Sequence, residues 1–182
     1  MNIEIAIKKA CQELKNNQIQ SALLDSELLL SKVIKKDREF LLLNLDKELS
    51  QNEQDSFKKL ILKRAKGKPL AYLTGIKSFW KHDFKVSEKV LIPRPDTEII
   101  IEQVLKIYKN KDYINFLEVG VGSGCIALSI LKEKKSFLGT GIDLSQDCIE
   151  ICRYNAKKLA VDNRIKLFKS DVDNLIFHKY DL

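Results

Sequence analysis

A glycine-rich turn between an apolar strand and an apolar helix constrains this chain more than any other feature. Residues 116–130 read Phe-Leu-Glu-Val-Gly-Val-Gly-Ser-Gly-Cys-Ile-Ala-Leu-Ser-Ile. Glycine is needed where the backbone takes positive φ or passes close to a ligand. A second apolar strand is predicted over 137–142, and Asp143 follows it directly. This order predicts a pocket of nucleotide size, in which the acid can accept both hydroxyls of a ribose.

The glycine spacing narrows the class of ligand. A dinucleotide-binding loop reads Gly-x-Gly-x-x-Gly, whereas this chain reads Gly120-x-Gly122-x-Gly124 and has Cys125 where the third glycine would stand. No Lys-Ser or Lys-Thr pair follows, so a phosphate-binding P-loop is also disfavoured. The pattern from Glu118 resembles the first motif of class I S-adenosylmethionine methyltransferases. The alternative is an ordinary strand–turn–helix whose glycines serve packing.

The flanking segments extend this resemblance over essentially the whole chain. Gly-Lys-Pro-Leu-Ala-Tyr-Leu-Thr-Gly stands at 67–75 and Leu-Ile-Pro-Arg-Pro-Asp-Thr-Glu at 91–98. Arg-Tyr-Asn-Ala follows at 153–156 and Ser-Asp-Val at 170–172. This order resembles the protein-(glutamine-N5) methyltransferases that modify peptide chain release factors. The resemblance implies S-adenosylmethionine as cofactor, a release factor as protein substrate, a role in translation termination, and no direct requirement for nucleic acid.

The resemblance also implies roles for particular residues. The implied cofactor-binding residues are Glu118, Gly120, Val121, Gly122, Ser123, Gly124, Asp143, Leu144, Asp171 and Val172. Among them, Glu118 is the acid near the cofactor ammonium, or equally an acid favoured by the dipole at a helix N-terminus. Asp143 is the ribose-binding acid, and a helix N-cap is compatible with that role. Asn155 is expected to make a polar contact from its helix.

A second implied set lies on the substrate side and consists of Arg94, Thr97 and Glu98. The alternative for these three residues is a rigid Pro-x-Pro turn followed by a helix cap. No metal site is expected, because the four cysteines form no paired Cys-x-x-Cys clusters. Cys148 and Cys152, four apart on a predicted helix, are expected to be buried small apolar residues.

One motif of the family is missing from the sequence. In the family, Asn-Pro-Pro-Tyr follows the fourth strand and holds the target amide, but this chain contains no such motif and ends at Tyr-Asp-Leu, which resembles the opening of that strand. We therefore expect no catalytic residue in this chain, no activity, an unpaired edge along 116–119 and low stability. Two alternatives stay open: a methyltransferase acting on exocyclic amines of nucleic acid, or a non-catalytic fragment that docks a partner or binds cofactor weakly.

Hydrophobic periodicity divides the chain into three parts and predicts an α/β protein. Residues 1–75 are expected to form a helical substrate-recognition bundle, with helix starts at Ser21, Asp37 and Ser50. Residues 76–92 are expected to form a linking β-hairpin that includes 90–92. Residues 93–182 are expected to form the cofactor half of an incomplete Rossmann-like methyltransferase sheet, with a helix capped by Asp96 and parallel strands at 116–119, 137–142 and 165–168.

The net charge of +7 is unevenly distributed. Residues 1–90 carry 18 Lys and Arg against 12 Asp and Glu, whereas 91–182 carry 14 against 13. One interpretation is that the basic first half binds ribosomal RNA or an acidic partner protein. The alternative is that the excess of positive charge belongs to a lysine-rich surface exposed to solvent. No stretch approaches the length of a membrane span and no signal peptide is evident, so a cytoplasmic protein with no membrane partner is expected.

Overall fold

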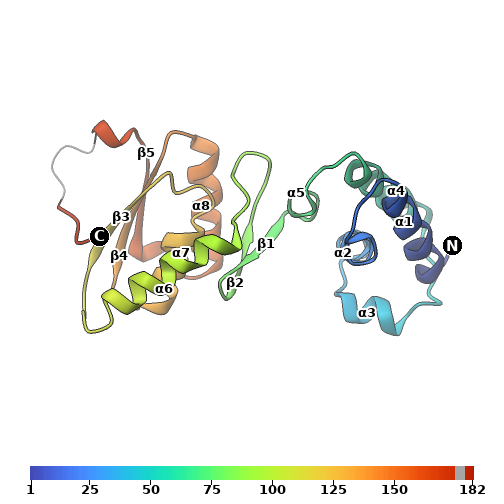
Figure 1. Ribbon diagram of the computed structural model, residues 1–182, viewed down its shortest axis with the longest axis horizontal. Coiled ribbons are helices and arrows are strands. Elements are labelled where there is room, and N and C mark those ends of the chain that lie inside the picture. The colour runs from blue at the N-terminus through green and yellow to red at the C-terminus, as the bar shows by residue number, and fades with distance from the viewer. Residues whose placement is uncertain (175–178) are drawn as a thin grey trace. The chain divides into compact units, whose positions relative to one another are not determined.

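The computed structural model describes residues 1–174 and 179–182, and it divides the chain into two compact units (Figure 1). The first unit comprises residues 1–74 and the second 75–182. The β-hairpin, predicted as a linker of its own, falls inside the second unit. Each unit has its own apolar core, and each is described separately below.

The first unit is entirely helical. Its helices are α1 (Ile3–Asn16), α2 (Ala22–Ile34), α3 (Arg38–Leu43), α4 (Gln51–Ala65) and α5 (Leu70–Thr74). The apolar faces of these helices meet in one core, which includes Leu14, Leu30 and Phe57. A buried ion pair crosses it, because Arg64 Nε donates to Asp25 Oδ2 at 2.6 Å. The predicted helical bundle is therefore the observed architecture of this unit.

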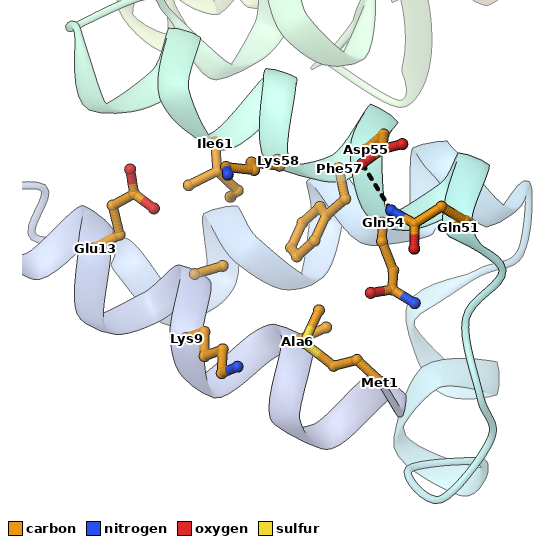
Figure 2. A pocket seen from close by; sticks show the side chains of 11 residues that line it. Met1, Ala6, Lys9, Glu13, Gln51, Gln54, Asp55, Phe57, Lys58 and Ile61 are labelled. Carbon is orange, nitrogen blue, oxygen red and sulfur yellow. Dashed lines mark hydrogen bonds between the residues drawn. The ribbon is translucent and has the colours of Figure 1, made fainter.

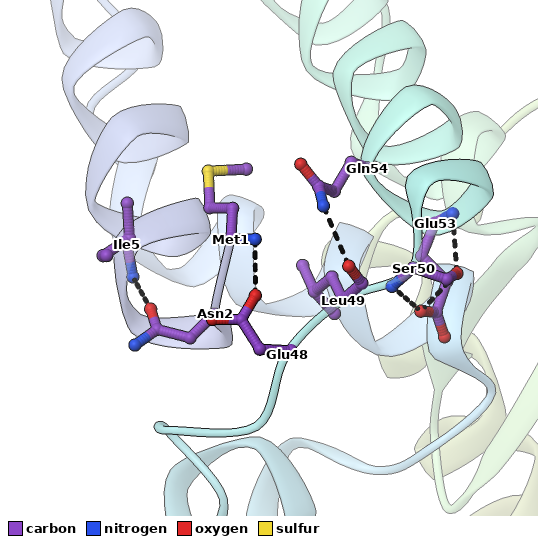
Figure 3. Close-up of polar contacts among 8 residues, drawn as sticks. All are labelled: Met1, Asn2, Ile5, Glu48, Leu49, Ser50, Glu53 and Gln54. Atoms are coloured by element: carbon purple, nitrogen blue, oxygen red, sulfur yellow. Dashed lines mark hydrogen bonds and ion pairs between the residues drawn. The ribbon is translucent and has the colours of Figure 1, made fainter.

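Two of the three predicted helix starts are confirmed by side-chain caps. Asp37 Oδ1 accepts from the Phe40 N–H at 2.7 Å, and Ser50 forms the full capping box with Glu53 (Figure 3). These bonds satisfy N–H groups that have no partner inside the helix. Ser21 precedes α2 but makes no side-chain cap bond, so its predicted capping role is wrong.

The start of the chain is tied to the loop that precedes α4 (Figure 3). The terminal ammonium of Met1 contacts Glu48 Oε2 at 2.5 Å, and the Leu49 N–H donates to the Met1 carbonyl at 3.1 Å. Asn2 caps α1, since its Oδ1 accepts from the Ile5 N–H at 2.9 Å. The first residues therefore belong to the fold of the helical unit.

A hollow of about 410 Å³ lies between α1 and α4 (Figure 2). Its floor is apolar and includes Phe57 and Ile61. Its rim carries charges of both signs, from Lys9 and Glu13 on α1 and from Lys58 on α4. No sequence pattern predicted this feature, because a hollow depends on how two helices pack against each other.

The second unit combines a hairpin, helices and a three-stranded parallel sheet. Its elements in order are β1 (Ile76–Phe79), β2 (His82–Lys85), η1 (Pro95–Thr97), α6 (Glu98–Ile107), β3 (Asn115–Val119), α7 (Cys125–Glu133), β4 (Leu138–Asp143), α8 (Gln146–Lys158), η2 (Asp162–Arg164), β5 (Ile165–Lys169) and η3 (Val172–Asn174). The strand order β3–β4–β5 with all strands parallel is the predicted βαβαβ arrangement. Helix α6 packs on α7, and both α7 and α8 pack on β4.

The segment between the hairpin and the sheet differs from its prediction. Residues 90–92 were expected to extend the hairpin, but β2 ends at Lys85 and these residues pair with no strand among the described residues. Asp96 was expected to cap a helix, but it lies inside the 3₁₀ turn η1 and makes no cap bond. A turn explains the first result, because the Val90 N–H donates to the Ser87 carbonyl at 3.1 Å and so separates residues 90–92 from β2. Pro95 explains the second, because it starts a tight turn that delays the α-helix to Glu98.

The outer edge of β3 is partly paired. The Asp181 N–H donates to the Asn115 carbonyl at 2.8 Å, and the Leu117 N–H donates to the Leu182 carbonyl at 2.9 Å. The Asn115 N–H donates to Asp181 Oδ2 at 2.8 Å. The expectation of an unpaired edge over 116–119 is therefore wrong at 117, because Leu182 supplies a hydrogen-bond partner there.

Candidate functional site

The glycine loop connects the end of β3 to the start of α7. Gly120, Gly122 and Gly124 have φ of +74°, +53° and +80°, a region that residues with a Cβ adopt only with strain. The N–H groups of Gly120 and Val121 both donate to the Ile142 carbonyl of β4 at 2.9 Å. The loop therefore starts as an extension of the sheet and then turns sharply into the helix.

The glycines differ in what surrounds them. A Cβ on Gly124 would lie 2.5 Å from Cys152 Sγ and 2.8 Å from Leu128 Cδ1, so this glycine is required for helix packing. A Cβ on Gly120 would meet nothing within 4 Å. The loop thus packs closely against α7 and α8 at its end and leaves open space at its beginning, where a ligand can approach the backbone.

Asp143 stands at the end of β4 and holds the loop from the neighbouring strand. Its Oδ2 accepts from the Gly122 N–H at 3.0 Å, and its Oδ1 accepts from the Ser145 N–H at 2.9 Å. The N-cap of α8 is Ser145, whose Oγ accepts from the Cys148 N–H, so the alternative of Asp143 as the cap is wrong. Each carboxylate oxygen keeps a further lone pair that can accept from a hydroxyl.

Glu118 places a second carboxyl beside the loop. Its Oε2 accepts from the Ala127 N–H at 2.8 Å, in the first turn of α7. Burial raises the pKa of the Glu118 carboxyl to about 8, the Ala127 N–H opposes this shift, and the charge of Asp143 reinforces it. Glu118 is therefore mostly protonated at neutral pH. This contact is the helix N-terminal interaction expected as one of its two roles.

The nearby cysteines are neutral packing groups. Burial raises the pKa of the Cys125 thiol to about 11 and raises that of Cys152 as well. Cys148 and Cys152 are buried, as their helical spacing predicted. Among the residues that the structure describes, no three His, Cys, Asp or Glu side chains gather in a way that could hold a metal ion.

Asn155 contacts the same loop from α8. This side chain is fully buried, and its Nδ2 donates to the Ser123 carbonyl at 2.9 Å and to the Lys85 carbonyl at 3.0 Å. Its Oδ1 accepts from the Lys85 N–H at 2.8 Å. Sequence reasoning predicted only a polar contact. The signal that could have shown more is a lone amide at helical spacing from the buried Cys148 and Cys152.

The segment after β5 comes to the same end of the sheet. The Ser170 N–H donates to the Asp143 carbonyl at 3.1 Å, so residues 170–172 leave the end of β5 beside the end of β4 that carries Asp143. Val172 is 48% exposed and begins η3, and Leu144 is 68% exposed. Asp171 turns the chain locally, because its Oδ1 accepts from the Asp173 N–H. These residues can therefore cover a ligand that lies over the loop.

Arg94, Thr97 and Glu98, the residues expected on the substrate side, lie at or just before the start of α6. Glu98 Oε1 accepts from the Trp80 N–H at 2.7 Å, at the hairpin turn where Trp80 has a φ of +54°. Glu98 therefore holds a strained turn in place, a contact that the sequence did not predict. Thr97 precedes α6 without a side-chain cap bond, and Arg94 is exposed. Within the described part of the chain, no hydrogen bond joins these three residues to the glycine loop.

A hollow of about 820 Å³ lies on the sheet and is separate from the glycine loop. Residues of all three strands line it, among them Asn115, Thr140 and Phe168. None of the loop residues 120–124 contributes to it. The candidate site is therefore defined by the contacts of the loop and not by this hollow.

Each of the two units contains a segment that matches a known family model. Residues 6–75 match the family model described as PrmC N-terminal domain, and residues 96–182 match the methyltransferase small domain. The release factor glutamine methyltransferase of Leptospira interrogans is 38% identical over 168 residues, covering 91% of this chain and 59% of that protein. This chain is similar to release factor glutamine methyltransferases along both units. The order of the two matches is the order of the two units described above.

Other relatives show the same similarity. The release factor glutamine methyltransferase of Buchnera aphidicola is 35% identical over 182 residues, covering 100% of this chain and 65% of that protein. A bifunctional methyltransferase of Rickettsia felis is 36% identical over 209 residues, covering 100% of this chain and 40% of that protein. The chain thus spans between two fifths and two thirds of the length of these three relatives. None of the helices that the structure describes is long and apolar enough to cross a membrane.

The two environments of the loop glycines predict different effects of one methyl group. Gly124→Ala adds both backbone strain and a clash with Cys152, whereas Gly120→Ala adds a similar strain in open space. We expect Gly124→Ala to lower the free energy of unfolding by about 1–3 kcal/mol more than Gly120→Ala does. Thermal and urea unfolding of the two variants measure this difference. Equal losses would contradict the packing role of Gly124.

The raised pKa of Glu118 predicts a pH dependence of stability. Between the ordinary carboxyl pKa and about 8, the folded protein holds a proton on Glu118 that the unfolded chain has released. The free energy of unfolding should therefore fall as pH rises through this window, by at most about 1.4 kcal/mol per pH unit from this group. Glu118→Gln should flatten the curve.

The matched control for this experiment is Glu102→Gln, which changes an exposed carboxylate of α6 in the same unit. Urea unfolding at pH 5, 6, 7 and 8 measures all three proteins. The stability of Glu118→Gln relative to the starting protein should rise with pH, whereas that of Glu102→Gln should not. Parallel curves for Glu118→Gln and the starting protein would show that Glu118 is charged throughout.

Proposed function

We propose that this protein binds S-adenosylmethionine at the glycine loop and serves methyl transfer to a glutamine side-chain amide of a peptide chain release factor. The observation that carries the proposal is the succession of two family matches, 6–75 and 96–182, across the two units of the structure. The second match includes the loop, Asp143 and the segment after β5. Relatives with this order are named release factor glutamine methyltransferases.

The residues around the loop fit the proposed cofactor. Open space at Gly120 lets a ligand approach the backbone, and both oxygens of Asp143 keep lone pairs for ribose hydroxyls. We assign Val121 and Ser123 the role of offering backbone groups, and Leu144, Asp171 and Val172 that of bracketing the adenine. When bound, the cofactor supplies an electrophilic methyl group. Glu118, mostly protonated in the empty site, would release its proton to meet the cofactor ammonium.

The target nitrogen sets the task of the protein. An amide nitrogen is a poor nucleophile because its lone pair is delocalised into the carbonyl. Catalysis therefore depends on holding the amide in line with the methyl group and on acceptors aimed at its N–H groups. The sequence contains no Asn-Pro-Pro-Tyr. We accordingly assign residues 96–182 to cofactor binding, and Arg94, Thr97 and Glu98 to the substrate side.

The helical unit is the proposed contact for the release factor. Residues 1–74 carry 14 Lys and Arg against 10 Asp and Glu, an excess of four positive charges that supports an acidic surface on the partner. Such a contact weakens as salt screens the charges. This role also accounts for a family-specific helical domain that general cofactor binding does not require.

The cofactor assignment predicts a selective loss of affinity in Asp143→Asn. The substitution leaves one acceptor oxygen where the loop and the ribose need two, so affinity for S-adenosylhomocysteine should fall at least about tenfold. Asp147→Asn is the control, because Asp147 lies nearby at the start of α8 but pairs with the exposed Lys89. Calorimetry measures both. Tighter binding of NAD than of S-adenosylhomocysteine by the unchanged protein would refute the assignment.

A chimera tests the transfer itself. Residues 1–182 of this chain are joined to the remaining residues of the Leptospira relative, and the product is incubated with methyl-labelled cofactor, a release factor and, separately, RNA and DNA. We expect label on a glutamine of the release factor, reduced at high salt, and none on nucleic acid. The 182-residue chain alone should transfer no label. Label on an exocyclic amine of nucleic acid would instead establish the other substrate class.

A further inference from the structure

Asn155 joins two parts of the second unit that are far apart in sequence. It lies on α8 and binds Ser123 in the glycine loop, 32 residues away, and Lys85 on β2, 70 residues away. We propose that Asn155 is a positioning residue that couples the glycine loop to the β1–β2 hairpin, so that ligand binding at the loop also orders the hairpin. The proposal rests on the proposed function only in taking the loop as the cofactor site.

On the loop side, Asn155 fixes one peptide group. Ser123 is buried between Gly122 and Gly124, and its carbonyl receives the Asn155 Nδ2 bond at 2.9 Å. The peptide that carries this carbonyl also carries the Gly124 N–H, which donates to the Val121 carbonyl at 2.8 Å. Because a peptide group is planar, holding its carbonyl also sets the direction of its N–H. Asn155 therefore stabilises the turn that the three glycines make possible.

On the hairpin side, Asn155 acts as a strand partner. Its amide oxygen accepts from the Lys85 N–H at 2.8 Å, and its amide nitrogen donates to the Lys85 carbonyl at 3.0 Å. A side-chain amide can make this pair of bonds because it carries the same donor and acceptor as a peptide group. Two further residues of α8 hold the same strand. Lys158 Nζ donates to the Asp83 carbonyl at 2.8 Å, and the Tyr154 ring lies 4.2 Å from Lys85 Nζ.

A single short side chain makes all three bonds, and this property couples the two parts. Both N–H groups of the amide are engaged, one toward the loop and one toward the hairpin. If the Ser123 carbonyl shifts, the Asn155 amide must move with it to keep their hydrogen bond. The bonds from the same amide to Lys85 then require Lys85 to move as well, or a buried hydrogen bond is lost. Neither Lys158 nor Tyr154 is bonded to the loop in the described structure, so they hold the hairpin but do not link it to the loop.

The hairpin carries this coupling toward the substrate side. Its turn residue Trp80 donates its backbone N–H to Glu98, at the start of α6, and its indole Nε1 donates to Glu133 at 2.7 Å. Glu98 follows Arg94 and Thr97, the other proposed substrate-side residues. Cofactor binding at the loop should thus order the segment that meets the protein substrate, and the two ligands should bind cooperatively.

Amide hydrogen exchange, followed by NMR on the 182-residue chain, tests the coupling without ligand. Asn155→Asp keeps the shape and the acceptor for Lys85 but replaces the donor nitrogen with oxygen. We expect the Gly124 and Lys85 amides both to exchange at least about tenfold faster. Lys158→Met is the matched control, because it removes a hairpin contact from the same helix. It should speed exchange at Lys85 and leave Gly124 unchanged.

The second arm adds S-adenosylhomocysteine. In the unchanged protein the ligand should slow exchange at both Gly124 and Lys85, whereas in Asn155→Asp it should slow Gly124 alone and bind several-fold more weakly. Two results would overturn the coupling. One is a Lys85 exchange rate that does not change when ligand binds the unchanged protein. The other is a Gly124 exchange rate that does not change in Asn155→Asp. Failure of the unchanged protein to bind S-adenosylhomocysteine would refute the proposed function instead, and the ligand-free arm would still decide the coupling.

Circular dichroism establishes that each variant is folded. If Asn155→Asp does not fold, the unchanged protein decides the question through the urea dependence of its exchange. Amides that open in one event share one opening free energy and one slope. The Gly124 and Lys85 amides should then show the same protection within about tenfold and the same dependence on urea. Different slopes would show that the loop and the hairpin open independently.

Discussion

The second unit depends on how the polar backbone of residues 120–124 is satisfied. Positive φ at three glycines turns the chain sharply, and one hydrogen bond within the loop runs from the Gly124 N–H to the Val121 carbonyl. Other partners come from neighbouring elements: the Ile142 carbonyl and the Asp143 carboxylate of β4, and the Asn155 amide of α8. A buried peptide group without a partner costs free energy, so these contacts are a condition for the loop to exist.

The same contacts determine the electrostatics of the site. The Asp143 carboxylate accepts from two backbone N–H groups, whereas Glu118 accepts from one, and burial raises the pKa of Glu118 to about 8. Under the proposed function, Asp143 keeps lone pairs for hydroxyl groups and Glu118 can release a proton when a cation binds. This division of roles follows from the packing of α7 against the end of β3.

Much of the fold was predictable from local pattern. The three parallel strands were predicted within one residue of their observed bounds, and the Asp37 and Ser50 caps follow from short-range geometry. The errors arose where a neighbouring restriction outweighed propensity. A turn at residues 87–90 separated 90–92 from the hairpin, and a 3₁₀ turn that starts at Pro95 kept Asp96 from capping α6. The β3 edge found partners in residues 181 and 182. The sequence indicated the opening of a strand at these residues, but the expectation of an unpaired edge left out their pairing with β3.

The sequence by itself determined the class of site. Glycine spacing, the acids after two strands and the family segments decide which backbone can pass close to a ligand, and these are properties of residue types in order. Only the tertiary structure decided what satisfies the loop. Helical spacing places Asn155 on the buried face of α8, but it does not reveal that Lys85, 70 residues earlier, lies opposite. A hydrogen bond depends on both partners, and the sequence pattern around one of them specifies only its own orientation.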